Sequence, residues 1–425
     1  MVLLFGSMIA LFAIGIPIAF ALAISACLFG MISGISLIAV AQRITNGANS
    51  FTMMAIPFFI LAGEIMNATG ITQHLIAFAK TIIGQIKGGM MYVVILANMI
   101  MAGVSGSSIA DACAIGSVTI PAMEKEGYKR DFVTALNGAA ATIGPIIPPS
   151  MGFVMYAAIV GCSVGDLFLA GVLPGILMGV AFGVVCYLKA LKEDFPLSEK
   201  YSREERIRTT KKAVWALLMP IIIIGGILIG LVTPTEAAVL ACVYGLLVGF
   251  FVYRTIKLND LPLILFRSAK SALSVMIIVA CASAFGWMLT VEGTPQVLIK
   301  AFSAVSSEPW IFLLLINCIF LLLGCILDVD TLIIVFVPLL IPALKLYQID
   351  FVYFGVVFTI NTMVGQLTPP VGELLYAISS IGKTPVLKTS KQLIPFYVAL
   401  VVVLMIITYI PIVPMLLPRL FGYSG

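Results

Sequence analysis

Charged residues are scarce in this chain. Only 10% of its 425 residues are charged, 61% are hydrophobic, and the mean hydropathy is +1.17. Soluble globular domains carry about 25% charged residues, so this chain has too few to cover a water-facing surface. The shortage argues against an ordinary soluble enzyme or binding domain and predicts a membrane protein.

Several chemical signatures are also missing. The eight cysteines are scattered through apolar segments without a CxxC spacing, which argues against a disulfide framework or a zinc site. The single histidine, His74, cannot assemble a metal cluster alone. No Walker-type phosphate loop is present and no basic run alternates with aromatic residues, so we expect neither ATP hydrolysis nor nucleic-acid binding. We therefore predict no catalytic residues and no bound cofactor.

What the chain does contain is a series of apolar runs close to or longer than the ~18–20 residues that cross a bilayer. The first, 2–32, has no charge and no cleavage site followed by a polar region, so we expect a retained span rather than a signal peptide. Spans are predicted at 2–32, 51–68, 132–162, 167–190, 213–232, 236–253, 267–290, 351–381 and 393–418.

Two further apolar stretches, 89–123 and 309–344, are interrupted in the middle. The first contains Gly-Val-Ser-Gly-Ser-Ser-Ile-Ala-Asp at 103–111, and the second contains Gly-Cys-Ile-Leu-Asp-Val-Asp-Thr at 324–331. At 1.5 Å per residue, neither half of such a stretch crosses about 30 Å of hydrocarbon. We predict two re-entrant helical hairpins with polar tips.

Lysine and arginine predict the orientation. The segment 189–212 holds eight of the 24 basic residues, and 124–131, 254–270 and 383–391 hold ten more. If these loops are cytoplasmic, the N-terminus lies inside, the C-terminus lies outside, and the two hairpins open to opposite sides. The polar segment 191–212 is expected to be a cytoplasmic amphipathic connector.

The second half of the sequence weakly repeats the first at one constant displacement. Each copy contains a hairpin followed by a span that a Gly-x-x-x-Pro-Pro motif interrupts, and consecutive prolines unwind a helix. Unwound carbonyls must be buried in protein or line a cavity. We predict an all-α polytopic inverted-repeat transporter with repeats at 1–190 and 213–425 and unwound helices at 132–162 and 351–381. The matched residues are Gly103 and Gly324, Pro121 and Pro342, Gly144 and Gly365, Pro148 and Pro369, and Pro149 and Pro370.

Oxygen ligands at the tips suit a hard cation such as Na⁺. Ser105, Ser107 and Ser108 supply hydroxyls at the first tip, and Thr368 supplies one beside the second Pro-Pro motif. The alternative for the tip serines is helix capping. Acidic residues are also expected at membrane depth, where they are costly unless paired or functional. These are Asp111, Asp328 and Asp330, of which the last two are equally explained as caps of the second hairpin helix.

No lysine or arginine lies within 88–123, 132–163, 309–344 or 351–382. If the substrate is an anion, helix N-termini and bound cations must therefore provide the positive potential. Transport of an anion would then depend on a cation for a physical reason.

Five motifs make the chain resemble the large membrane subunit of tripartite ATP-independent periplasmic (TRAP) transporters over nearly its full length. The overall pattern is most similar to the sialic-acid branch. The motifs are Met101-Ala-Gly-Val-Ser-Gly-Ser-Ser-Ile-Ala-Asp111, Gly144-Pro-Ile-Ile-Pro-Pro-Ser150, Leu169-Ala-Gly-Val-Leu-Pro-Gly175, Thr233-Pro-Thr-Glu-Ala-Ala238 and Leu367-Thr-Pro-Pro-Val-Gly372.

The resemblance implies an elevator mechanism in the bacterial inner membrane, with Na⁺ as the coupling ion. A transport domain of hairpins and broken helices would move against a scaffold of the other spans. The implied partners are a small membrane subunit, expected as a separate chain because no four-helix unit precedes Met1, and a periplasmic binding protein that delivers the substrate. Implied sodium-site residues are Ser105, Ser107, Ser108, Gly144 and Pro148 for one ion, and Gly324, Gly365 and Thr368 for a second. Candidate substrate-site residues are Gly106, Pro149, Ser150, Asp328 and Pro370.

Two alternatives remain at this point. A single-component Na⁺/dicarboxylate carrier of the same superfamily would share the hairpins but work without a binding protein. An intramembrane aspartyl enzyme would need Asp111 to share a proton with Asp328 or Asp330. The family transports sialic acids, C4-dicarboxylates and other organic acids, and no residue identifies which of them is the substrate here.

Overall fold

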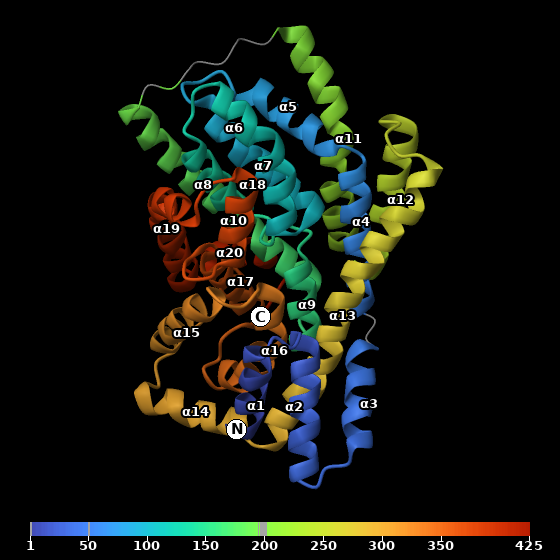
Figure 1. Ribbon diagram of the computed structural model, residues 1–425, viewed down its shortest axis with the longest axis vertical. Coiled ribbons are helices and arrows are strands. Elements are labelled where there is room, and N and C mark those ends of the chain that lie inside the picture. Colours follow the sequence, from blue (N-terminus) through green and yellow to red (C-terminus); the bar gives the residue numbers. More distant parts are fainter. Residues whose placement is uncertain (1, 50–51, 194, 196–201) are drawn as a thin grey trace.

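The computed structural model describes residues 2–49, 52–193, 195 and 202–425, and these residues form helices and no β-strand (Figure 1). Among these residues, six helices are long and apolar enough to cross a membrane, or up to eight if two bent helix pairs each count as one span. The α-helices are α1 (Val2–Ala13), α2 (Ile18–Ile32), α3 (Leu37–Ala48), α4 (Ala55–Ala68), α5 (Ile71–Ile83), α6 (Gly89–Ser105), α7 (Ser108–Lys125), α8 (Arg130–Ala141), α9 (Met151–Val160), α10 (Val164–Lys192), α11 (Arg203–Leu228), α12 (Pro234–Leu247), α13 (Leu261–Val291), α14 (Thr294–Val305), α15 (Pro309–Gly324), α16 (Val329–Leu346), α17 (Phe351–Leu367), α18 (Glu373–Gly382), α19 (Val386–Tyr409) and α20 (Ile412–Leu420).

The expected single span at 2–32 is wrong. The segment forms α1 and α2, which pack against each other and are separated by a turn that ends at Pro17. Proline suits the start of a helix because its missing N–H would be unpaired there. Hydropathy alone hides this boundary, since the turn is as apolar as the helices beside it.

Three helices were not expected from the sequence. α3, α5 and α14 are only 12 or 13 residues long, and polar residues interrupt each of them. α5 follows α4 at an angle of 69°, and α14 precedes α15 at 115°. α5 is followed by α6, and α14 by α15. Each of these two short helices thus immediately precedes a helical hairpin.

The connector expected at 191–212 is divided by the structure. Residues 194 and 196–201 lie outside the described part, and 203–212 form the first turns of α11, continuous with the span that follows. Ser202 and Glu205 form a capping box at this start, in which each side chain pairs with the other residue's backbone N–H.

The interruptions fall where the sequence placed them. α6 and α7 form the first hairpin around residues 106–107, and α15 and α16 form the second around 325–328. α8 and α9 are separated at 142–150, which we call the first break, and α17 and α18 at 368–372, the second break.

The two hairpins and the helices that follow them keep one spacing along the chain. α7 starts at Ser108 and α16 at Val329, and both helices contain 18 residues. The starts of α8, at Arg130, and of α17, at Phe351, are separated by the same interval. This interval is also the displacement that aligns the glycine and proline pairs of the sequence repeat.

The broken helices lie at the centre of one group of helices. α17 is buried from Val352 to Leu367 and packs against α9, α10, α15, α16, α18 and α19, whereas α13 packs against α2, α3 and α4 in a second group (Figure 1). Contacts of α13 with α16 and of α4 with α6 and α9 join the two groups.

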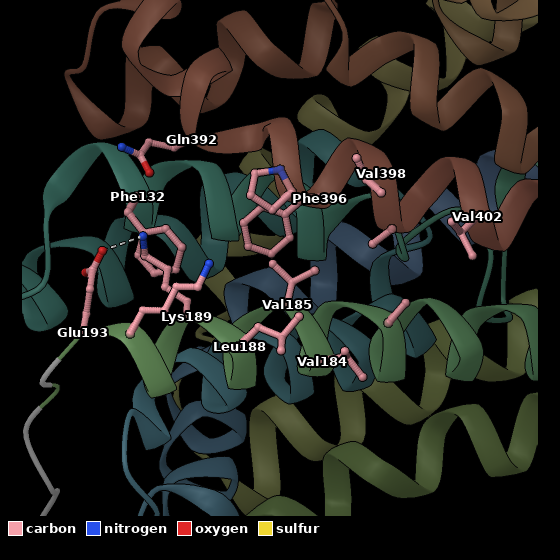
Figure 2. Close-up of a pocket in the computed structure, with 14 residues that line it drawn as sticks. Phe132, Val184, Val185, Leu188, Lys189, Glu193, Gln392, Phe396, Val398 and Val402 are labelled. Atoms are coloured by element: carbon pink, nitrogen blue, oxygen red, sulfur yellow. Dashed lines mark hydrogen bonds and ion pairs between the residues drawn. The ribbon is translucent and has the colours of Figure 1, made fainter.

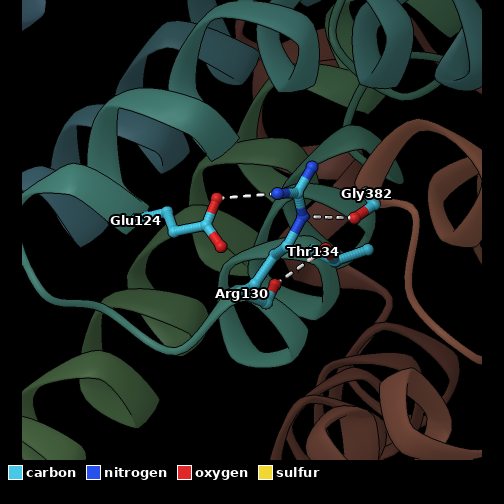
Figure 3. Close-up of polar contacts among 4 residues, drawn as sticks. All are labelled: Glu124, Arg130, Thr134 and Gly382. Carbon is cyan, nitrogen blue, oxygen red and sulfur yellow. Dashed lines mark hydrogen bonds and ion pairs between the residues drawn. The ribbon is translucent and has the colours of Figure 1, made fainter.

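Two hydrogen bonds connect the broken helices across the halves of the chain. Arg130, at the start of α8, donates from Nε to the Gly382 carbonyl at the end of α18 (2.6 Å) and from Nη1 to Glu124 of α7 (2.7 Å) (Figure 3). In the other direction, the Tyr156 hydroxyl of α9 donates to the Phe351 carbonyl at the start of α17 (2.9 Å). Arg130 thus joins α8 to α18, and Tyr156 joins α9 to α17.

Candidate functional site

The tips of the two hairpins meet at one small cavity, which we call the tip cavity. Its volume is about 140 Å³, and both halves of the chain contribute to its wall. It lies where four helices begin, namely α7, α9, α16 and α18. The lining residues are Gly106, Ser107, Ser108, Ile109, Pro145, Met151, Gly152, Asp328, Val329, Asp330, Met363, Gln366 and Glu373.

Side chains cap three of these four helix starts. Ser107 Oγ accepts from the Ala110 N–H (3.4 Å), Ser150 Oγ from the Phe153 N–H (3.2 Å), and a carboxylate oxygen of Asp328 from the Thr331 N–H (3.2 Å). The capping alternative is therefore confirmed for Ser107 and Asp328. The remaining N–H groups of each first turn have no partner within the helix, so they attract anions.

Asp111 lies behind the first tip and not in the tip cavity. Its side chain is fully buried, and one carboxylate oxygen accepts a hydrogen bond from Ser105. The other oxygen, Oδ2, has no hydrogen-bond partner among the described residues, and a Cβ placed on Gly144 would lie 2.6 Å from it. Three of the residues expected around the first ion thus lie close to Asp111: Ser105 bonds its Oδ1, Gly144 lies beside its unpaired Oδ2, and the Ser107 carbonyl accepts its backbone N–H.

The residues expected around the second ion also come together. A Cβ on Gly365 would lie 2.7 Å from the Cα of Gly324, so the two backbones touch because both residues are glycine. Thr368 donates its backbone N–H to the Gly365 carbonyl (2.8 Å) and its hydroxyl to the Val364 carbonyl (2.6 Å). The second break therefore packs against the end of α15 through backbone atoms.

Of the remaining predicted site residues, some line the tip cavity and others do not. Ser108, Gly106 and Asp328 line the tip cavity, and Gly106 has the left-handed conformation (φ 62°) that the turn between α6 and α7 requires. Pro148 and Pro149 face α6 and its turn through their carbonyl oxygens, near Gly103 and Gly106 respectively. Ser150 is buried and donates to the Pro145 carbonyl (2.6 Å), while Pro370 is exposed and lies outside the lining.

Three polar side chains of the lining were not among the predicted site residues. They are Asp330, which was considered only as an acid or a cap, Gln366 and Glu373. A signal was available for Glu373, because it is the only acidic residue within 351–382, at membrane depth. Gln366 stands inside the Gly-x-x-x-Pro-Pro motif, but only the packing of the two tips shows that it faces a cavity.

A larger cavity of about 630 Å³ lies elsewhere, between α8, α10 and α19 (Figure 2). Its wall is mostly apolar and includes the exposed side chains of Val184, Leu188 and Val398. At one end, Lys189 forms an ion pair with Glu193 (3.1 Å). None of the predicted site residues lines it, so its size does not make it the functional site.

The geometry of the acids also bears on the aspartyl-enzyme alternative. That alternative requires Asp111 and Asp328 or Asp330 to share a proton, yet Asp111 faces Ser105 and the first break, whereas the other two line the tip cavity.

Comparison with known proteins decides the family. Residues 5–413 match the model of the tripartite ATP-independent periplasmic transporter, DctM component. The chain belongs to this family. It is 38% identical to the sialic acid TRAP transporter large permease protein SiaM of Vibrio cholerae over 425 residues, 99% of each chain. It is also 38% identical to the C4-dicarboxylate TRAP transporter large permease protein DctM of Pseudomonas aeruginosa over 384 residues, 90% of each chain.

The fold is also similar to a solved transporter structure. The YdaH transporter of Alcanivorax borkumensis matches with a TM-score of 0.63 at 12% identity, over 88% of this chain and 87% of that one. Family membership confirms the resemblance to the large TRAP membrane subunit. The chain is a multi-pass transport permease for organic acids and not an enzyme.

Proposed function

We propose that this chain carries a small organic acid across the bacterial inner membrane together with Na⁺. Its proposed partners are a small TRAP membrane subunit and a periplasmic binding protein, as the family name "tripartite" suggests. The observation that carries the proposal is the buried Oδ2 of Asp111, which has no partner beside the first break. A buried carboxylate oxygen without a partner is costly, and a cation satisfies it.

The oxygen atoms around Asp111 are suitable ligands for a hard cation. Sodium prefers several oxygen ligands, and this region offers the Asp111 carboxylate, the Ser105 hydroxyl, the Ser107 hydroxyl that caps α7, and the backbone of the first break at Gly144. Ser108 and Pro148 are proposed to complete this set, and Gly324, Gly365 and Thr368 are proposed to hold a second ion. Bound cations would then offset the negative charge of an organic acid at the tip cavity, whose lining contains no basic residue.

We further propose that the two halves are inverted repeats and that the hairpins and broken helices move as one elevator body. The equal spacing of α7 and α16 and of α8 and α17 supports a repeat. The cross-connections from Arg130 and Tyr156 support a single body. Cysteines at the matched exposed positions Lys125 and Leu346 should react with an impermeant external reagent only at the second, once the exposed Cys113 and Cys318 are replaced.

The orientation expected for the N-terminus needs revision under this proposal. The Phe5 ring of α1 packs edge-on against the Phe285 ring near the end of α13, with the ring centroids 5.9 Å apart. Arg267 and Lys270 lie near the other end of α13. If the basic end of α13 is cytoplasmic, α1 begins near the outer surface. We therefore propose that the N-terminus is outside. Tyr423, which donates to Asp350 at the base of the second hairpin (2.7 Å), supports an outside C-terminus as expected.

The test is uptake by the assembled three-component system in vesicles. Replacing Na⁺ with K⁺ should stop uptake of the acidic substrate even when a proton gradient is imposed, and omitting the small subunit or the binding protein should do the same. Undiminished uptake without Na⁺ would show that protons drive transport. Undiminished uptake without the binding protein would instead indicate a single-component carrier.

A further inference from the structure

The tip cavity has two walls of different chemistry. On the side of the first half of the chain, α7 and α9 begin with the neutral caps Ser107 and Ser150, and no acidic residue from this half lines the cavity. On the side of the second half, Asp328, Asp330 and Glu373 all line it at the starts of α16 and α18. One wall therefore presents positive helix N-termini, and the other presents three carboxylates.

Two of the three carboxylates lack partners. Asp328 accepts hydrogen bonds from the Thr331 N–H and hydroxyl, so it serves its own helix. Asp330 is half-buried and Glu373 is exposed, and within the described part of the chain neither has a protein hydrogen-bond donor or a cationic side chain in reach; the cavity lining contains no lysine, arginine or histidine. Two unpaired carboxylates therefore face the same small space.

Gln366 gives an independent indication of what this space binds. Its side chain is only 4% exposed, it lines the tip cavity, and its Oε1 has no hydrogen-bond partner. Leaving a buried acceptor unpaired destabilises the folded protein. This oxygen requires a hydrogen-bond donor, and the described part of the chain does not supply one.

We propose that the tip cavity binds a zwitterion, a small acid that carries an ammonium group. Its carboxylate lies against the N-termini of α7 and α9, and its ammonium group lies among Asp330, Gln366 and Glu373. This inference rests on the proposed function and narrows its substrate class. A dicarboxylate fits less well because its second negative charge would face two carboxylates in a partly desolvated site, where like charges repel strongly.

The arrangement also gives the two ends of the ligand different tasks. Helix N-termini hold the carboxylate with N–H groups that the helices cannot use themselves. The ammonium group offers donors to two carboxylates and an amide oxygen at once, which resolves the unpaired acceptors of this wall. Binding in the reverse direction would place each charge against its own sign.

The experiment uses the purified chain with its small subunit and follows thermal stability as ligands are titrated. The probes are glycine, β-alanine and γ-aminobutyrate, each compared with malonate, succinate or glutarate. In Na⁺, at least one amino acid should stabilise the protein with an apparent affinity at least about tenfold above that of every dicarboxylate. Stabilisation by dicarboxylates instead, or by none of the probes, would overturn the proposal.

Charge-neutralising variants sharpen this result. Asp330→Asn and Glu373→Gln should each reduce the preference for the amino acid by roughly tenfold, and the double variant should abolish it. Glu308→Gln, which neutralises an exposed acid at the start of α15, is the matched control and should leave the preference unchanged. If the cavity variants raise the Na⁺ concentration required but keep the preference, these acids bind Na⁺ and the zwitterion proposal is wrong.

The outcomes separate this inference from the proposed function. Binding of dicarboxylates that still requires Na⁺ removes only the zwitterion. Binding of any probe that is equally strong in K⁺ contradicts Na⁺ coupling, whatever the preferred ligand.

Discussion

The two halves of this chain share a backbone plan but differ in the polar groups that it carries. In both halves a hairpin tip packs against a break in a helix, at equivalent positions of the repeat. In the first half the acid, Asp111, is buried behind the tip, and serines cap the helix starts. In the second half the acids face the tip cavity, and backbone atoms of tip and break touch directly at Gly324 and Gly365.

The matched glycine and proline positions therefore preserve how the chain bends, while the polar side chains differ between the two halves. Glycine and proline determine backbone conformation and close approach, so they recur at equivalent positions. The side chains that face ions or ligands follow local requirements. Single substitutions at equivalent positions should therefore have unequal effects.

The largest difference is expected at Gly144 and Gly365, which are equivalent. A Cβ at Gly365 would meet the Gly324 backbone at 2.7 Å, whereas one at Gly144 would meet the end of the Asp111 side chain at 2.6 Å. Backbone cannot give way, so Gly365→Ala should destabilise the protein by about 3 kcal/mol or more, or prevent folding. Gly144→Ala should cost about 1–3 kcal/mol because the carboxylate can rotate.

Thermal melts of the purified protein check this order. Gly6→Ala is the control, since Gly6 lies within α1 and a Cβ there has no neighbour within 4 Å. Alanine there should be neutral or slightly stabilising. Equal losses at Gly144 and Gly365 would show that the second break is not held by direct backbone contact.

The second prediction concerns Asp111 and its role in binding Na⁺. Asp111→Asn keeps the shape but removes the charge, and loss of a charged ligand costs about 3 kcal/mol. The Na⁺ concentration for half-maximal transport should therefore rise roughly a hundredfold. Asp166→Asn, at an acid in the first turn of α10 outside the hairpins, should shift it less than about twofold. An Asp111→Asn variant that transports normally with unchanged Na⁺ dependence would contradict the proposed ion site.

The sequence predicted the interruptions because their causes are local. Both Pro-Pro motifs and the glycine-rich tip at 103–111 act on the backbone of their immediate neighbours, and the helix boundaries near them followed. α3, α5 and α14 were missed because they are short and amphipathic and contain no run long enough to span a bilayer. Gln366 was missed for a different reason, because its position becomes informative only when two tips from opposite halves of the chain meet. Glu373 could have been found from the sequence, as the only acidic residue within 351–382.

The third prediction compares the two cross-connections. Arg130 satisfies the Gly382 carbonyl, which lies at the end of α18 and has no partner further along that helix (Figure 3). Arg130→Gln should therefore lower the free energy of unfolding by about 1.5–3 kcal/mol. Tyr156→Phe should cost only about 0.5–1.5 kcal/mol, because the Phe351 carbonyl still pairs within α17.

A separate variant isolates the exposed ion pair from the carbonyl contact. Glu124→Gln removes the partner of Nη1 but leaves the bond to Gly382, and it should cost less than about 1 kcal/mol. Melting curves that rank Glu124→Gln with Arg130→Gln would attribute the effect to the ion pair, and the carbonyl contact would then have little role in joining the halves.

The smallest effects are expected from the hydroxyl groups at the tips. Ser107 caps α7 and the Thr368 hydroxyl donates to Val364, so both have structural partners, while Ser108 lines the tip cavity. If all three also supply oxygen to Na⁺, Ser107→Ala, Ser108→Ala and Thr368→Val should each raise half-saturating Na⁺ about two- to tenfold, equivalent to about 0.5–1.5 kcal/mol. Ser108→Thr keeps the oxygen and should shift it far less.

Capping alone predicts a different pattern for these three variants. Ser107→Ala would then lower stability by about 0.5–2 kcal/mol, while the Na⁺ dependence of the remaining folded transporter would not change. Ser108 is the decisive residue, because its hydroxyl has no capping bond among the described contacts. If the tip hydroxyls act only as caps, removal of the Ser108 hydroxyl should change neither stability nor the Na⁺ dependence. A shift in Na⁺ dependence at Ser108 without loss of stability would assign the hydroxyl to the ion. If all three variants keep half-saturating Na⁺ within about twofold, only the Asp111 carboxylate, the Ser105 hydroxyl and the backbone carbonyls remain as proposed ligands, and the two ion sites then differ because only the first has side-chain ligands.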